Sequence, residues 1–298
     1  MNNTVKHIPV LLNEVLEALA PQAGKTYVDA TFGNGGYSEA LLKAADCRLI
    51  AVDRDPNVRP RAEELKSVYG SRFDFRPGRF GDIERLIQEP VDGIVFDIGV
   101  SSMQIDNPER GFTYKADGPL DLRLDPEKGI SAAERLKQMD KEEIAGMLVE
   151  NSDEPYAEEI AREIAKRNRK HLYIETTTEL KGVIETTLAF IPEKERKEAV
   201  KKSCQRCFQA LRIDVNQEFE VLESFLSKLP GILAPGGRAA ILTFHSGEDR
   251  LVKYYFKDGK RAGLYSDVAD DVIRPSAEEC QRNPRARSTK MRWAVKAE

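Results

Sequence analysis

Cysteine and histidine are scarce in this sequence, and long hydrophobic runs are absent. The 298 residues include four cysteines and three histidines, too few for the disulfide framework of a small secreted domain. No apolar run approaches the roughly 20 residues that cross a bilayer, and the N-terminus lacks the basic prelude of a signal peptide. We therefore expect a cytoplasmic protein that does not enter a membrane.

An excess of positive charge is also lacking. The chain has 46 Lys and Arg against 50 Asp and Glu, for a net charge of −4, so any nucleic acid must be held by a local basic patch. Basic clusters lie at 166–171, 201–212 and 282–292. Taken singly, each is more typical of a solvated helix face or a tail than of a binding site.

The first 100 residues alternate strand and helix signals, as in a parallel sheet with helical connections. Short apolar runs predict strands at 26–31, 48–53, 73–76 and 93–97. Strand signals return at 237–243 and 291–295, after a helix predicted at about 217–229. We expect a doubly wound α/β domain that is formed by residues 1–106 and 214–298.

The intervening residues 107–213 have almost no strand signal. Helix starts recur there: Ser131-x-x-Glu134 and Thr176-x-x-Glu179 have the spacing of a capping box, in which each side chain satisfies a free amide at the helix start. Apolar residues such as Ile160 and Ile164 also follow at helical spacing. We expect an inserted all-helical domain of about 100 residues.

A glycine-rich corner follows the first predicted strand, at Asp29-Ala-Thr-Phe-Gly-Asn-Gly-Gly36. Glycines there let the backbone pass close to a ligand, and a helix N-terminus offers unpaired amides. Asp53 ends the next strand, where a carboxylate in doubly wound folds accepts hydrogen bonds from ribose hydroxyls. The pair predicts a nucleotide-like cofactor, although such a corner can also simply close a strand–helix turn.

The glycine spacing separates two such cofactors. Dinucleotide sites prefer G-x-G-x-x-G, and counting from Gly33 the third glycine position is occupied by Ser38. The pattern is closer to the acidic-x-G-x-G-x-G of S-adenosylmethionine enzymes, with Thr31 in place of the first glycine. This favours S-adenosylmethionine over NAD, which stays the more distant alternative.

Asp97 ends the fourth predicted strand, at the edge where open α/β sheets bind ligands. It is the first candidate for a catalytic residue that holds the N–H of an acceptor amine, and a role in cofactor binding alone is an equal alternative. The Pro-Pro-aromatic sequence that often follows this position in amine methyltransferases is absent, since the chain continues as Ile98-Gly-Val100.

No metal site is expected. The three histidines show no metal-ligand spacing, and Cys204-x-x-Cys207 lacks a second cysteine pair or a nearby histidine. Buried helix cysteines are the better interpretation. His245 is instead a candidate for lining the site, as is His7.

A set of further motifs runs along the whole chain: His7-Ile-Pro-Val-Leu-Leu-Asn-Glu14, Val52-Asp-Arg-Asp-Pro56, Phe96-Asp-Ile-Gly-Val-Ser-Ser102, Glu109-Arg-Gly-Phe-Thr113, Asp117-Gly-Pro-Leu-Asp-Leu-Arg-Leu-Asp125, Phe208-Gln-Ala-Leu-Arg-Ile213, Leu233-Ala-Pro-Gly-Gly-Arg238, Phe244-His-Ser246, Glu248-Asp-Arg250 and Asn283-Pro-Arg-Ala-Arg-Ser288. Together with the glycine corner and in this order, they resemble the bacterial RsmH (MraW) 16S ribosomal RNA cytosine-N4 methyltransferases. No single motif is decisive, but the ordered set is highly specific.

The resemblance implies a class I (Rossmann-like) methyltransferase sheet with an inserted helical domain that recognises RNA. It implies transfer of a methyl group from S-adenosyl-L-methionine to the exocyclic amine of a cytidine in the decoding region of the small ribosomal subunit. The partner is then 16S rRNA or the small subunit, and a homodimer is compatible with the sequence. By the same resemblance the cofactor contacts fall on Gly35, Gly36, Tyr37, Asp53, Phe80, Asp97 and Gln104.

The chain departs from the family pattern at a few places. Tyr37 stands where the family usually has histidine, Glu158-Glu159 where a basic residue is expected, and 267–272 is acidic where the family is more basic. Two alternatives therefore stay open: a diverged paralogue that methylates another RNA, DNA or a small molecule, and a non-catalytic RNA-binding or assembly factor. Phe112 and Tyr114 are candidates to stack on an extruded base, with anchoring of their own loop as the alternative.

Overall fold

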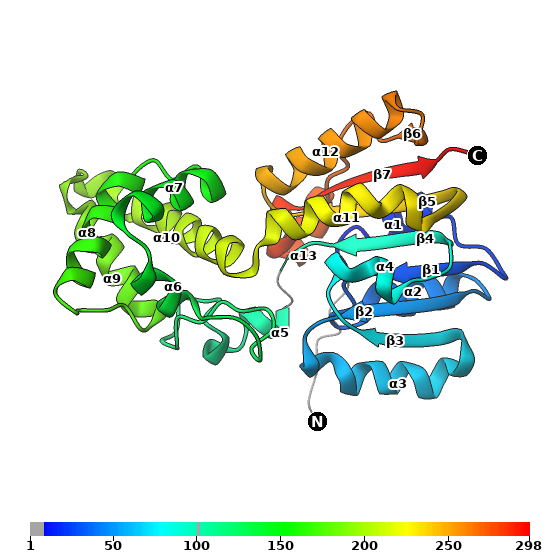
Figure 1. The fold of residues 1–298 in the computed structure, drawn as a ribbon, viewed down its shortest axis with the longest axis horizontal. Coiled ribbons are helices and arrows are strands. Elements are labelled where there is room, and N and C mark those ends of the chain that lie inside the picture. The colour runs from blue at the N-terminus through cyan, green and yellow to red at the C-terminus, as the bar shows by residue number, and fades with distance from the viewer. Residues whose placement is uncertain (1–8, 100–101) are drawn as a thin grey trace. The chain divides into compact units, whose positions relative to one another are not determined.

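The computed structural model describes residues 9–99 and 102–298, and it divides into two compact units (Figure 1). The first, here called the sheet unit, consists of Met1–Gly99 and Glu220–Glu298, and the second, the helical unit, of Val100–Phe219. The predicted domain boundaries, 106/107 and 213/214, fall inside the helical unit. The second of them cuts the last turn of a long helix.

The sheet unit is built on a seven-stranded sheet in the order β3-β2-β1-β4-β5-β7-β6. The first five strands in this order are parallel, and β7 is antiparallel to both of its neighbours. This order, with one reversed strand, confirms the predicted class I methyltransferase sheet. The strands are β1 (Thr26–Asp29), β2 (Arg48–Asp53), β3 (Phe73–Pro77), β4 (Val91–Asp97), β5 (Leu233–Thr243), β6 (Tyr265–Val268) and β7 (Lys290–Lys296).

Helices cover both faces of the sheet, because alternate residues of each strand point to opposite sides. In β2, Leu49 and Ala51 pack with α1 (Leu12–Leu19), α2 (Gly36–Ala44) and α3 (Arg59–Tyr69). Ile50 and Val52 of the same strand pack with the other group of helices, α4 (Ile83–Leu86), α11 (Glu218–Ile232) and α12 (Ser246–Arg261). The central strands are therefore buried on both faces, as a parallel sheet requires.

Two further short segments follow β6 in the chain. They are α13 (Ala277–Arg282) and the 3-10 helix η6 (Pro284–Ser288), which leads directly into β7. Ala286 of η6 is buried in the same core as α1, α2 and α3. The C-terminal segment is thus part of the sheet unit's core and does not form a loose tail.

The helical unit has its own apolar core, formed mainly by α6 to α10. Its predicted caps are present, since Ser131 accepts a hydrogen bond from the Glu134 amide and Thr176 forms a complete capping box with Glu179. The helices are α5 (Ser102–Ile105), α6 (Ala132–Gln138), α7 (Lys141–Ser152), α8 (Ala157–Arg169), α9 (Thr177–Thr187) and α10 (Glu193–Asn216). The prediction of an inserted all-helical segment is confirmed.

Two sequence features of the helical unit prove to be packing features. Cys204 and Cys207 are buried in α10 as free thiols, which confirms the interpretation as buried helix cysteines. Tyr114 lies with its ring centroid 5.2 Å from that of Phe208, and Phe112 also packs against the helical core. The contacts of both aromatic rings favour the anchoring alternative over stacking on a base.

None of the helices in the described parts of the chain is both long enough and apolar enough to cross a membrane.

Candidate active site

Three strands of the sheet unit end in aspartate. Asp29, Asp53 and Asp97 are the last residues of β1, β2 and β4, and because these strands are parallel neighbours their carboxyl ends meet at one edge. The loops that leave this edge are tied together, since the Asp97 amide donates to the hydroxyl of Thr31 at 2.8 Å. The predicted corner and the two predicted carboxylates therefore belong to one site.

The glycine corner turns tightly between β1 and α2. Gly33 and Gly35 have φ values of 49° and 71°, a left-handed conformation that favours glycine. A Cβ on Gly35 would lie 2.7 Å from the Phe32 ring, and one on Gly36 would lie 2.2 Å from Cγ of Pro9. The need for glycine at 35 and 36 thus comes from the chain's own packing, while contact of their backbone with the cofactor remains a prediction.

Replacing Gly36 by alanine is expected to destabilise the chain by about 1–3 kcal/mol, because the new methyl group must displace the Pro9 ring from a packed position. Thermal unfolding should show the loss. Gly182→Ala is the matched control: Gly182 lies inside α9, and a Cβ there meets nothing within 4 Å. That variant should be unchanged or stabilised by up to about 1 kcal/mol. Equal melting temperatures for Gly36→Ala and the parent chain would contradict the packing argument.

Asp53 holds the glycine corner against β2. Its Oδ2 accepts a hydrogen bond from the Gly33 amide at 2.7 Å, and its Oδ1 accepts one from the Asp55 amide at 2.9 Å. A carboxylate oxygen can accept two hydrogen bonds, so each oxygen retains an acceptor position. Burial raises the pKa of Asp53 above its usual value, and hydroxyl donors would offset that cost by stabilising the charge.

Asp29 is a buried carboxyl group that the sequence marked only as the start of the glycine pattern. Its Oδ2 accepts a hydrogen bond from the Ser38 hydroxyl at 2.7 Å, and its Oδ1 accepts one from the Thr31 amide at 3.2 Å. Burial raises the pKa of Asp29 to about 6. Ser38 occupies the position of the third dinucleotide glycine, so the residue that breaks that fingerprint has a defined partner in this fold.

Asp97 is the least compensated of the three carboxyl groups. Its Oδ1 is buried and has no hydrogen-bond partner among the residues that the structure describes. Burial, together with the negative charges of Asp29 and Glu248, raises the pKa of Asp97 to about 7. A buried acceptor without a partner at a strand end is typical of a ligand-binding position.

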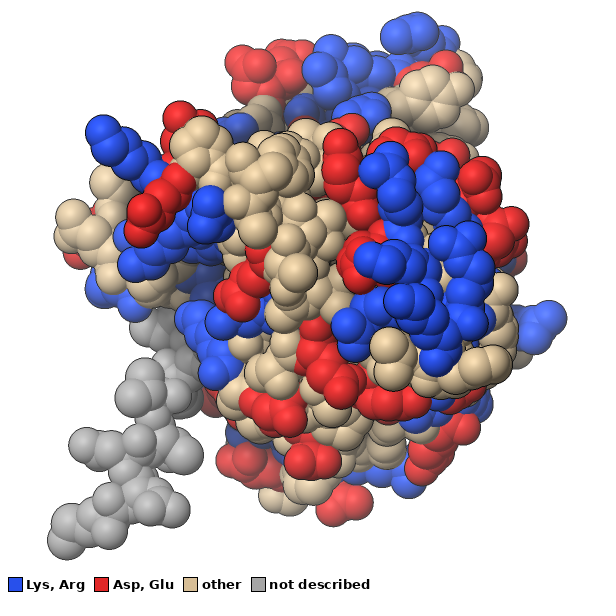
Figure 2. Space-filling model, turned by 90° about the vertical axis from the view of Figure 1, so that its left-hand side faces the viewer, with Lys and Arg blue, Asp and Glu red and all other residues tan. Residues whose placement is uncertain are grey.

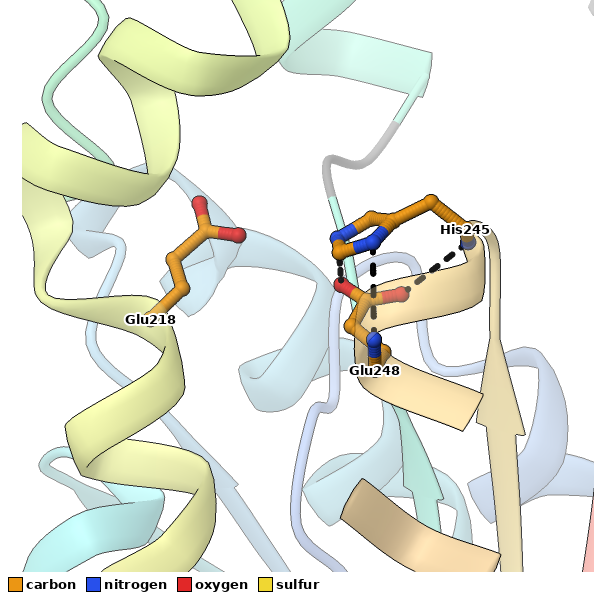
Figure 3. Close-up of side chains that lie close together, drawn as sticks. All are labelled: Glu218, His245 and Glu248. Carbon is orange, nitrogen blue, oxygen red and sulfur yellow. Dashed lines mark hydrogen bonds and ion pairs between the residues drawn. The ribbon is translucent and has the colours of Figure 1, made fainter. Parts of the chain in front are cut away.

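Glu248 is a second buried carboxyl group, which the sequence marked only as part of a family motif and without a role. It lies in the first turn of α12, which follows β5, and its side chain is 1% exposed. His245 caps this helix and its Nε2 lies 3.0 Å from Oε1 of Glu248, while Oε2 accepts a hydrogen bond from the Phe244 amide at 2.8 Å (Figure 3). Histidine is not among the usual N-cap residues, so the sequence did not predict that this pair caps α12, although both residues lie in motifs of the family pattern.

The structure accounts for three other predicted contacts differently. The Tyr37 hydroxyl donates to the Val10 carbonyl at 2.7 Å, so this side chain fixes the N-terminal segment. Phe80 packs against the sheet core, with its ring centroid 4.4 Å from that of Phe96 and the two rings tilted. Gln104 lies in α5 of the helical unit. The cofactor contacts of all three remain predictions, and His7 lies outside the described residues.

The carboxyl groups at this edge fit S-adenosylmethionine. That molecule is cationic at its sulfur and its amino group, and it carries two ribose hydroxyls. Burial raises the pKa values of Asp53 and Asp97, and acceptor positions remain on Asp53 and on Asp97 Oδ1. A ligand that brings positive charge and hydroxyl donors suits such carboxyl groups, because it stabilises their ionised form.

Comparison with known proteins agrees with this geometry. The chain matches the MraW methylase family over residues 4–297. It is 56% identical to "Ribosomal RNA small subunit methyltransferase H 1" of Lachnoclostridium phytofermentans, an alignment that covers 98% of this chain and 81% of that protein. The protein of the same name from Agathobacter rectalis is 54% identical, with 98% and 86% covered. "Ribosomal RNA small subunit methyltransferase H" of Rickettsia bellii is 41% identical, with 97% and 98% covered.

These matches extend over nearly the whole chain, helical unit included, and over most of each relative. The chain belongs to the MraW methylase family and is an S-adenosylmethionine-dependent methyltransferase.

Proposed function

We propose that this protein methylates the exocyclic N4 amine of a cytidine in 16S rRNA, in the decoding region of the small ribosomal subunit, within the cytoplasm. Its relatives are named as methyltransferases of the small subunit's ribosomal RNA. The observation that supports a reaction site in this chain is the oxygen Oδ1 of Asp97, which is buried and has no hydrogen-bond partner among the described residues.

S-adenosylmethionine supplies an activated methyl group on a cationic sulfur. We assign its ribose hydroxyls to Asp53, whose two oxygens each retain an acceptor position beside the glycine corner. Gly35, Gly36, Tyr37, Phe80 and Gln104 are the further contacts that the family resemblance assigns. Asp29 supports this arrangement indirectly, because it binds Thr31 and Ser38 on either side of the corner.

The acceptor amine needs help, because its lone pair is delocalised into the cytosine ring. A carboxylate that accepts one amine hydrogen holds the nitrogen in line for attack, and such positioning supplies much of the rate enhancement. As the new N–C bond replaces the bond between the methyl group and sulfur, whose electron pair stays on the sulfur, the nitrogen loses one proton. Asp97, with a pKa of about 7, is well matched to take that proton at neutral pH.

The helical unit is proposed to bind RNA. On the face that Figure 2 shows, Lys and Arg side chains form a large patch with acidic side chains mostly around it, and smaller groups of them lie elsewhere on the same face. Exposed basic residues occur on and just beyond α8 and on α10, namely Arg162, Lys166, Arg169, Lys170, Lys194, Lys197, Lys201 and Lys202. Such clusters attract phosphate in a chain whose net charge is negative.

Mass spectrometry of small-subunit RNA is the direct test. A strain that lacks the gene should lose methylation at one cytidine N4, and the wild-type gene should restore it. An Asp97→Asn gene, expressed at the same level, should not restore it. An unchanged nucleoside profile in the deletion strain would contradict the proposed substrate and would favour a paralogue with another target.

A further inference from the structure

The C-terminal segment of the sheet unit carries a concentration of positive charge that the proposed cofactor contacts do not use. Residues 282–292 contain five basic residues and no acidic residue, in a chain of net charge −4. The segment includes the motif Asn283-Pro-Arg-Ala-Arg-Ser288, which belongs to the family pattern. The core packing of Ala286 anchors the backbone of this segment to the sheet unit.

The strand topology brings this segment to the edge that bears Asp97. Strand β7 is antiparallel to β5, and its first residue, Lys290, pairs with Thr243, the last residue of β5. Within β5, Leu242 pairs with Asp97. The start of β7 and the η6 turn before it therefore lie at the carboxyl edge of the sheet, two strands away from Asp97.

A second basic side chain reaches the same place from another segment. Ile273 and Met291 exchange two backbone hydrogen bonds of 2.9 and 2.8 Å, and this antiparallel bridge places Arg274 beside Lys290. Asp270 and Asp271 precede Arg274 by only a few residues. The basic surface is thus a narrow strip and not a broad face.

The charges of this strip are only partly neutralised by the protein. Arg292 is bound by Asp249, with distances of 2.7 and 3.2 Å to the two carboxylate oxygens, and Lys290 lies 4.0 Å from that same occupied carboxylate. Arg274 and Arg287 are exposed, and within residues 9–99 and 102–298 neither pairs with a carboxylate. Two arginines without a carboxylate partner, and a lysine that shares its carboxylate with Arg292, are therefore available to bind an external anion.

We propose that Arg274, Arg287 and Lys290, together called the edge strip, bind the phosphates of the RNA strand next to the target cytidine. This rests on the proposed function. A base that is methylated on its amine must leave its stack, and single-stranded RNA beside it presents its phosphates to the protein. Arginine binds phosphate with two parallel hydrogen bonds. The strip would thereby hold the backbone while the base turns toward Asp97.

The test compares Arg274→Gln, Arg287→Gln and the double variant in binding to small subunits purified from the deletion strain, over a series of salt concentrations. Each single change should weaken binding about fivefold. It should also reduce the slope of the logarithm of the binding constant against the logarithm of salt concentration by about 1, because one phosphate contact that releases a counterion is lost. Arg261→Gln is the matched control. Arg261 is exposed and ends α12, which starts at the carboxyl edge and so carries Arg261 toward the opposite one.

Calorimetry with S-adenosylmethionine separates this proposal from the proposed function. All four variants should bind the cofactor as the parent chain does, which also shows that they are folded. Unchanged subunit affinity and salt dependence in the double variant would overturn the edge strip. Strip-dependent binding of equal strength to vesicles of phosphatidylglycerol would overturn the assignment to RNA. If the strip variants weaken subunit binding but deletion of the gene leaves the cytidine unaltered, the proposed function fails, and the strip is retained as a contact with the subunit's phosphates but not as one beside a target cytidine.

Discussion

Replacing Asp53 by asparagine is expected to weaken the binding of S-adenosylmethionine by about 100-fold. Hydrogen bonds to a charged group contribute about 1.5–3 kcal/mol each, and a loss of about 2.7 kcal/mol corresponds to 100-fold. Asparagine keeps one acceptor oxygen but replaces the other with a donor, which faces either the Gly33 or the Asp55 amide. The variant therefore loses one of its two hydrogen bonds to backbone amides at the corner, together with the negative charge that stabilises hydrogen bonds from the ribose hydroxyls.

Calorimetric titration measures this effect, and thermal unfolding shows whether the fold survives. Asp46→Asn is the matched control, since Asp46 is a mostly exposed carboxylate between α2 and β2 whose ion partner Arg72 lies 3.5 Å away. Its loss should change cofactor affinity by less than about twofold, because an exposed ion pair contributes little. An Asp53→Asn affinity within threefold of the parent value, in a folded variant, would remove Asp53 from the cofactor site.

The parts of this fold that could be predicted are those with a strong local pattern. Strands β1, β2 and β4 are short apolar runs that end in aspartate, so periodicity and composition were enough to find them. The capping boxes of the helical unit are also local, because each involves residues only three apart. The alternation of strands and helices indicated a parallel sheet with helical connections, while the order of its strands came only from the structure.

The parts that could not be predicted depend on partners distant in the sequence. Strand β6 has only its two end residues buried, so its sequence carries no strand signal and it exists because β7 pairs with it. The requirement for glycine at position 36 comes from Pro9, 27 residues earlier. Likewise, nothing in the sequence around Glu248, a residue of α12, indicates that its charge acts on Asp97 at the end of β4. Sequence located the site, but only the fold showed which carboxyl groups influence one another.

Replacing Asp97 by asparagine is expected to lower kcat by a factor of 10² or more, the usual contribution of a positioned general base. Asparagine can still accept one amine hydrogen but cannot take the proton. If Asp97 acts on the substrate, the affinity for S-adenosylmethionine should stay within about threefold of the parent chain. A large loss of that affinity with kcat unchanged would instead make Asp97 a cofactor-binding residue, the alternative that its sequence position left open.

The pH dependence gives an independent signature of the same residue. The reaction requires the ionised carboxyl group, so the rate for the parent chain should rise with pH up to about 7 and level off above it. The profile of Asp97→Asn should be flat over this range. A parent profile that is flat between pH 5.5 and 8, with chemistry limiting the rate, would contradict a base with this pKa.

Stability should change in the opposite direction from activity. The pKa of Asp97 is about 7 in the folded chain and near its ordinary value of 3.8 in the unfolded chain, so between these values the folded state binds more protons. The free energy of unfolding that this group contributes is then greatest below about pH 4 and is lost as the pH rises through about 7. At pH 8 the buried carboxylate destabilises the cofactor-free protein, and Asp97→Asn removes that charge.

The inactive variant should therefore melt about 2 °C or more above the parent chain at pH 8, with a smaller gain at pH 5, where the folded carboxyl group is already neutral. Such a trade of stability for activity is characteristic of a functional carboxylate that the fold leaves without a partner. A residue with a purely structural role would show the reverse, because its replacement would lower the melting temperature along with the rate. Calorimetric scans of the two proteins at pH 5 and pH 8 distinguish these outcomes, and a lower melting temperature for Asp97→Asn at pH 8 would contradict the proposed role.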